Sequence, residues 1–264
     1  MTVAVTSILE DTAVVRSAEV RAFAAATLDH DSPQGSVPPL FAARLAAPVI
    51  RRVLAGVLAD RAGPVVHVAQ EVVCHGRLEV GQEVAVRGRL VELVDYGIAP
   101  AAVIETVVEA AGRLSTSTST MLLPGRRRAG TRPNRAARVV AGELFANTDV
   151  MLPEDLANRY AEASGDHNPI HTDPAVAQAV GLPGVVLHGM CTLAVLWAES
   201  GRLAGGRPVR ASCRFADPVR PGEPLAISLH RTDRPGMALA DVRQRGRAVL
   251  KSAVLEFSEE SSAG

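Results

Sequence analysis

Residues 164–171, SGDHNPIH, place an aspartate, an asparagine and two histidines within one short segment. Asp166 and His171 stand five positions apart, so on one folded segment their carboxylate and imidazole can hold a single water from two sides. A carboxylate and an imidazole placed in this way can move protons to and from that water. Such acid–base help is worth roughly 10²–10⁴-fold in rate. These residue types at this spacing have the means for acid–base chemistry, and the rest of the sequence must show whether the segment is a site or a turn.

The same segment also has the composition of a turn. Its common turn formers are Gly165, Asp166, Asn168 and Pro169. A turn does not need His171, however, and the pair His188-Gly189 follows at the start of an apolar helix. We interpret the whole set as a site, with His188 either fixing the start of that helix or contacting substrate.

The composition of the chain limits its classes of partner. The 264 residues carry a formal net charge of zero, so no broad attraction to nucleic acid or to an anionic membrane is expected. No apolar run approaches the roughly 20 residues of a membrane span. The three cysteines have no metal-binding spacing and no disulfide framework, which fits a reducing cytoplasm.

Three blocks of the first half recur in the second half, in the same order and at similar spacing. The paired blocks are 20–33 and 157–169, 79–86 and 220–227, and 110–122 and 244–256. In the first pair, Phe23 matches Tyr160 and Asp29 matches Asp166. Three ordered matches indicate an internal duplication, and we call the halves the first and the second copy.

Each copy has the pattern of a short helix, a longer apolar helix and then several strands. The expected helices cover 18–28 and 41–58 in the first copy, and 153–164 and 189–203 in the second. The clearest expected strands cover 65–74, 83–94, 101–110 and 113–123. One long helix followed by a run of strands predicts an α+β fold, with an antiparallel sheet wrapped on that helix.

The two copies diverge directly after their shared aspartate. The second copy inserts residues 170–186 before its apolar helix, and Asp173-Pro174 predicts the start of a short helix at 175–180. We expect a degenerate first copy at 1–123, a linker at 124–138 and a catalytic second copy at 139–264.

Residues 160–190 resemble the hydratase motif of the MaoC-like (R)-specific enoyl-CoA hydratases and 3-hydroxyacyl-thioester dehydratases. The resemblance implies a double hot-dog fold, in which each copy is a long helix wrapped by an antiparallel sheet. It also implies hydration of trans-2-enoyl thioesters, or the reverse dehydration, on CoA or acyl carrier protein. No metal and no cofactor beyond the phosphopantetheine of the substrate is expected, and the chain is expected to act as a monomer or a homodimer.

The resemblance also assigns roles to residues. It makes Asp166 and His171 the catalytic pair, Asn168 a supporting polar residue and the Gly189 amide an oxyanion donor. The first copy keeps Asp29 but has Leu28 where the glycine would stand, and it has no equivalent of His171. That copy is therefore expected to accommodate the acyl chain, with Phe41 as a candidate lining residue; the alternative is that Phe41 is plain core.

Two other functions fit parts of the sequence. One is a specialised dehydratase or cyclase of a polyketide-type pathway, which would use the same site on a carrier-bound intermediate. The other is a non-catalytic subunit that binds an acyl thioester and completes the site of a partner. The intact motif of the second copy argues against the non-catalytic function.

Overall fold

The computed structural model describes residues 7–29, 36–58, 63–125 and 139–258. Contacts divide the chain into two compact units. Unit 1 comprises residues 1–15 and 39–138, and unit 2 comprises residues 16–38 and 139–264. Most of the predicted linker, residues 126–138, lies outside the described residues.

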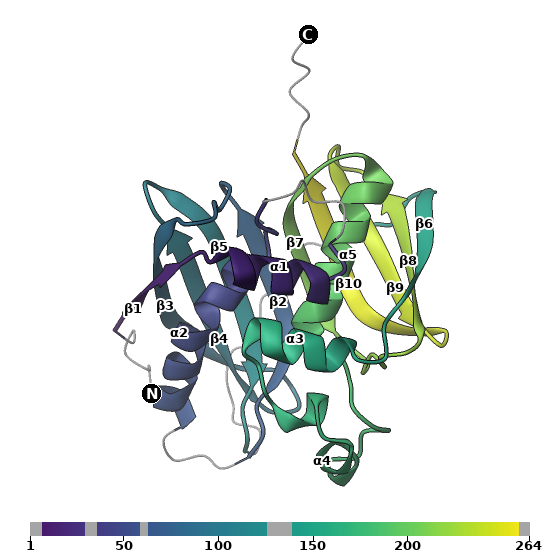
Figure 1. Cartoon of the computed structure of the whole chain (residues 1–264). Coiled ribbons are helices and arrows are strands. Elements are labelled where there is room, and N and C mark those ends of the chain that lie inside the picture. Colours follow the sequence, from purple (N-terminus) through teal and green to yellow (C-terminus); the bar gives the residue numbers. More distant parts are fainter. Residues whose placement is uncertain (1–6, 30–35, 59–62, 126–138, 259–264) are drawn as a thin grey trace. The chain divides into compact units, whose positions relative to one another are not determined.

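Unit 1 is one long helix on a five-stranded antiparallel sheet (Figure 1). Its elements are β1 (Leu9–Val14), α2 (Phe41–Leu58), β2 (Val66–Cys74), β3 (Glu83–Asp95), β4 (Pro100–Glu109) and β5 (Arg113–Leu122). The strand order is β1-β3-β4-β5-β2. Helix α2 packs on β3 and β4, where Val53, Leu90 and Ile104 belong to the buried core.

Unit 2 repeats this arrangement. Its elements are α1 (Ser17–Ala26), β6 (Leu144–Met151), α3 (Leu156–Ser164), a 3-10 turn η1 (Pro169–His171), α4 (Pro174–Ala179), α5 (Gly189–Ala204), β7 (Pro208–Phe215), β8 (Pro224–Arg231), β9 (Met237–Gln244) and β10 (Arg247–Phe257). The strand order β6-β8-β9-β10-β7 is that of unit 1 element for element. The apolar side of α5 buries Leu193, Val195 and Leu196. The shared topology supports the duplication inferred from the sequence blocks.

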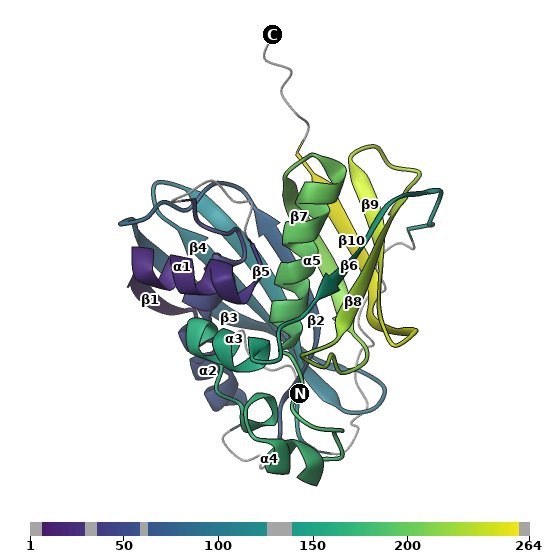
Figure 2. The same ribbon diagram turned by 45° about the vertical axis from the view of Figure 1, so that its right-hand side comes forward.

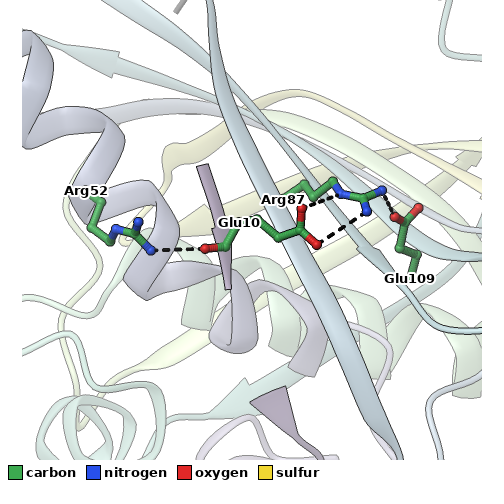
Figure 3. A network of polar contacts seen from close by, with 4 residues as sticks. All are labelled: Glu10, Arg52, Arg87 and Glu109. Carbon is green, nitrogen blue, oxygen red and sulfur yellow. Dashed lines mark hydrogen bonds and ion pairs between the residues drawn. The ribbon is translucent and has the colours of Figure 1, made fainter. Parts of the chain in front are cut away.

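The edge strands β1 and β6 are absent from the sequence-based expectation. Both are short and partly exposed, so their alternation of apolar and polar residues is weak. In unit 1, polar contacts hold the edge strand (Figure 3): Arg87 donates to the Glu10 carboxylate at 3.2 and 3.4 Å and also to Glu109, and Arg52 donates to the Glu10 carbonyl at 3.2 Å. The Arg87 and Glu10 side chains are about half exposed, so these contacts add little to stability.

Helix α1 departs from the expected division of the chain. By sequence it opens the first copy, but its contacts place it in unit 2 beside α3, as Figure 1 shows. The Phe23 and Tyr160 rings lie 5.9 Å apart, and Arg159 donates to the Ala25 carbonyl at 2.7 Å. The apolar face of α1 is therefore buried in the unit that carries the candidate site. None of the described helices is long and apolar enough to span a membrane.

Candidate active site

The polar segment after α3 is built by its own side chains. Helix α3 ends at Gly165, whose left-handed φ of 73° turns the chain. The Ser164 hydroxyl accepts from the Asp166 amide at 3.2 Å, and the Asp166 carboxylate accepts from the Asn168 amide at 3.3 Å. The Asn168 side chain then caps η1 by accepting from Ile170 at 3.4 Å. Most residues of the motif thus stabilise a turn. Asp166 is exposed to solvent.

The inserted segment continues from η1 into α4. Asp173 caps α4 by accepting from the amides of Ala175 and Val176 at 2.8 and 3.3 Å, and Pro174 occupies the first helical position. The helix expected at 175–180 is therefore present at 174–179. Figures 1 and 2 both show α4 lying beyond α3, away from the strands of unit 2. The chain then returns, and Val186 lies 15 residues from His171 in the sequence and against it in space.

The His171 ring has a defined tautomer. Its Nδ1 lies 2.7 Å from the Val186 carbonyl oxygen. Because a carbonyl can only accept, Nδ1 carries the hydrogen, and in the neutral ring Nε2 has a free lone pair. Burial lowers the pKa of His171 below its ordinary value of 6.5, although the Val186 hydrogen bond and the Asp166 charge oppose this effect. His171 is therefore a neutral base near pH 7.

Asp166, His171 and His188 each place one polar side-chain atom within 4.8 Å of the others. Two hydrogen bonds of about 2.8 Å through one water span such a separation. The Asp166 carboxylate and a ring nitrogen of His171 therefore lie close enough to share one water. Their catalytic roles stay predictions.

His188 is buried and contacts both Asp166 and His171. It immediately precedes α5, its side chain is only 2% exposed, and its Nε2 lies 2.9 Å from the Asp166 carbonyl oxygen. Its ring stacks on His171 at 3.7 Å between centroids with an interplanar angle of 26°, and the Tyr160 ring lies 4.9 Å away. Burial and the adjacent His171 lower the pKa of His188 to about 4. The proposed substrate contact by His188 has no support in this buried position, whereas the expected role at the start of the helix fits it.

Gly189 is the first residue of α5, so its N–H is among those that helix geometry leaves without an intrahelical acceptor. A Cβ at this position would lie 2.9–3.0 Å from three ring atoms of Phe215. Glycine is therefore required by packing, and its amide stands at the positive end of the helix dipole. Both features suit an oxyanion donor, a role that stays a prediction.

The two residues singled out in the first copy, Asp29 and Phe41, fall in different units. Asp29 follows α1 in unit 2, where its amide donates to the Ala24 carbonyl at 3.0 Å. Phe41 opens α2 in unit 1, with 0% exposure and the Arg44 guanidinium 5.4 Å from its ring centroid. A ring without accessible surface packs against other atoms, and this favours the core reading of Phe41 over the lining one.

A carboxylate and two imidazoles also form a possible metal-ligand set. A metal bound to an imidazole lies close to the plane of that ring. The planes of His171 and His188 are 3.7 Å apart at their centroids and inclined by only 26°, so they do not converge at the length of a metal–nitrogen bond. The three side chains are therefore poorly arranged to bind one metal ion and are better arranged for proton transfer.

Sequence reasoning did not find the partners of the histidines. The carbonyls of Val186 and Asp166, against which the two rings lie, carry no side-chain signal. The position of Tyr160 is marked by its match to Phe23 in the repeat, and Tyr160 also begins the segment 160–190 that resembles the hydratase motif.

Known proteins share the domain that carries this site. Residues 131–251 match the family profile described as MaoC like domain. The chain is 37% identical over 123 residues to the 3-hydroxyacyl-thioester dehydratase Y of Mycobacterium tuberculosis, a match that covers 42% of this chain and 42% of that protein. The alignment thus spans less than half the length of this relative.

Solved structures resemble the fold over nearly the whole chain. A MaoC-like dehydratase from Phytophthora capsici matches with a TM-score of 0.77 and 20% identity, covering 98% of this chain and 97% of that one. A Mycobacterium tuberculosis protein described as a double hotdog matches with a TM-score of 0.61 and 13% identity, covering 97% of each chain. The double hot-dog fold expected from the sequence is confirmed.

Proposed function

From the match of residues 131–251 to the MaoC like domain model, we propose that the protein is an (R)-specific hydratase of trans-2-enoyl thioesters. The reverse reaction is dehydration of 3-hydroxyacyl thioesters. One observation carries the proposal: the carboxylate of Asp166 and an imidazole of defined tautomer at His171 lie close enough to hold one water.

The reaction needs proton transfer, which we assign to Asp166 and His171, and stabilisation of negative charge, which we assign to the start of α5. Hydration attaches the water oxygen to C3 of the substrate and a proton to C2, so one proton leaves the water and one reaches carbon. Asp166 and His171 exchange these protons as general acid and general base. The Gly189 N–H faces the thioester oxygen as negative charge develops there, a contribution worth roughly 10²–10³-fold in rate for one donor.

This chemistry needs neither a redox group nor a metal, so we propose that the protein uses no cofactor. The substrate is a thioester of CoA or of acyl carrier protein. Cys74, Cys191 and Cys213 form no disulfide, and this supports a cytoplasmic location. Both copies reside in one chain, so the proposal holds for a monomer or a homodimer.

Two alternative functions, a polyketide-type enzyme and a non-catalytic binding subunit, differ in whether they need the Asp166 and His171 pair. A dehydratase or cyclase of a polyketide-type pathway would need the same pair, and it differs only in its acyl group. A non-catalytic binding subunit would not need a carboxylate and an imidazole of defined tautomer within reach of one water. The assembled pair therefore favours an enzyme.

The proposal is tested by absorbance of the conjugated thioester. Purified protein is mixed with crotonyl-CoA and with longer trans-2-enoyl-CoA substrates, and loss of the enone band reports hydration. The Asp166→Asn variant, which keeps size and shape, is the control for contaminating hydratases. Products are then oxidised by dehydrogenases specific for each 3-hydroxyacyl enantiomer, and a product that is not the R form contradicts the proposed stereochemistry. A folded wild-type protein that hydrates no CoA or carrier-bound substrate contradicts the proposed function.

A further inference from the structure

His188 makes two contacts that bear on the catalytic pair from the buried side. Its Nε2 lies 2.9 Å from the main-chain carbonyl of Asp166, and its ring covers one face of His171 at 3.7 Å. With a side chain only 2% exposed, His188 is shielded from substrate. Any effect of His188 on the reaction must therefore act through its neighbours, and its ring contacts two members of the candidate site, Asp166 and His171.

The hydrogen bond defines the protonation of His188. Because the Asp166 carbonyl can only accept, Nε2 carries the hydrogen, and in the neutral ring Nδ1 has none. Among the described residues, the buried Nδ1 has no hydrogen-bonding partner. Protonating Nδ1 would bury an N–H without an acceptor, which is costly. The geometry alone thus favours neutral His188.

The stack limits the charge of the two rings together. Two imidazolium ions 3.7 Å apart would repel each other strongly at a half-buried site. The other ionisable groups whose contacts or charges bear on these rings are Asp166, His167 and Tyr160. Of these only the Asp166 carboxylate favours a cation, whereas burial opposes one on either ring.

We propose that His188 is a positioning residue, which anchors the main chain of Asp166 and shields one face of His171 so that His171 stays neutral with Nε2 free. This inference rests on the proposed function for its kinetic consequence but not for its structural one. One residue, His188, thereby helps to fix the position of Asp166 and to keep His171 uncharged. The Tyr160 ring, 4.9 Å from the His188 ring between centroids, also packs against it.

Two substitutions separate the two contacts. His188→Phe keeps a flat ring over His171 but removes the N–H that anchors Asp166. His188→Gln keeps an N–H at a similar reach but removes the ring. His75→Gln changes an exposed histidine of unit 1 and serves as the matched control.

The first measurement is the titration of His171 by NMR, with its signals assigned by their loss in His171→Gln. In His188→Gln, water reaches the uncovered face, and we expect the pKa of His171 to rise toward its ordinary value near 6.5. In His188→Phe and His75→Gln it stays as in the wild type. This experiment needs no turnover, so it decides the shielding role even if the proposed hydratase activity fails.

The second measurement is hydration rate at alkaline pH, where His171 is neutral in every variant. We expect His188→Phe to lose roughly 10²-fold in kcat with little change in KM, since displacement of a catalytic group by about 1 Å has this effect. His188→Gln should retain most of its kcat there. The inference is overturned if His171 titrates identically in wild type and His188→Gln, or if folded His188→Phe keeps wild-type kcat.

Discussion

Leu28 and Gly165 hold the same left-handed backbone conformation at matching places in the two copies. The φ angle is 55° at Leu28, after α1, and 73° at Gly165, after α3, and an aspartate follows each. Glycine adopts this region freely, whereas leucine is strained there. The first copy has therefore kept the turn although it lacks the glycine, the inserted segment and the histidine of the second copy.

This strain can be measured at Leu28. We expect Leu28→Gly to be more stable than Leu28→Ala by about 1 kcal/mol, because both lose the leucine side chain and only alanine keeps the left-handed strain. At Ala25, an exposed position inside α1, the order reverses, and Ala25→Gly should cost about 1 kcal/mol. Urea unfolding measures all three variants. Equal stability of the two Leu28 variants contradicts the left-handed conformation.

The catalytic pair predicts non-additive losses. Asp166→Asn and His171→Ala should each remove nearly all hydratase activity, and the double variant should be little worse than either, since both groups act on one water. Asp29→Asn in the first copy is the matched control and should leave turnover unchanged. Steady-state rates and circular dichroism of each variant check the prediction. A near-normal rate for either single variant refutes the pair, and a halved rate for Asp29→Asn refutes a single site per chain.

The buried neutral histidine predicts a pH dependence of stability. The pKa of His188 falls from an ordinary 6.5 in the unfolded chain to about 4 in the folded protein. Between these values the unfolded chain binds the proton and the folded protein does not, so lowering the pH through this window favours unfolding. We expect a loss on the order of 3 kcal/mol from this histidine, complete once the pH lies below 4. Urea unfolding from pH 7.5 to 4 should show a shallower loss in His188→Gln than in wild type or His75→Gln; equal slopes contradict the prediction.

The close contact between Gly189 and Phe215 predicts a steric effect on the site. In Gly189→Ala the new Cβ meets ring atoms at 2.9–3.0 Å, so the helix start or the ring must move. We expect kcat to fall roughly 10²-fold as the amide leaves its place, and the added change Phe215→Leu should recover part of the loss. Gly56→Ala in α2 meets nothing within 4 Å and should raise stability by up to about 1 kcal/mol without changing kcat. Normal kcat in Gly189→Ala argues against its amide as the oxyanion donor.

Substitution of Phe41 tests whether this residue belongs to the core or lines the acyl-chain site. Its complete burial predicts that Phe41→Leu lowers the melting temperature and leaves the order of preference among acyl-chain lengths unchanged. The smaller Leu substitution is chosen because Phe→Ala in a core costs about 3–5 kcal/mol and could unfold the chain. Thermal unfolding and rates with a series of enoyl-CoA lengths measure the two effects. A changed length preference at normal stability would make Phe41 part of the acyl-chain surface.

Much of the fold could be predicted from local patterns. The long apolar helices, the central strands and the duplication follow from periodicity and from blocks that recur in order, all of which are properties of neighbouring residues. The edge strands β1 and β6 could not, because their apolar and polar residues alternate only weakly along the chain. The unit in which α1 buries Phe23 also could not, since an apolar face shows that a helix needs a partner and not which partner it finds.

The site divides in the same way. Sequence alone determined its residue types and local order: Asp166 and His171 at a spacing that lets them share a water, on a segment whose glycine, asparagine and proline form the turn. Only the tertiary structure decided the chemistry of the histidines. The tautomer of His171 depends on a carbonyl 15 residues away, and the tautomer of His188 on one 22 residues away. Protonation follows from which atoms meet in space and how far water is excluded, and neither is written in the spacing of residues along the chain.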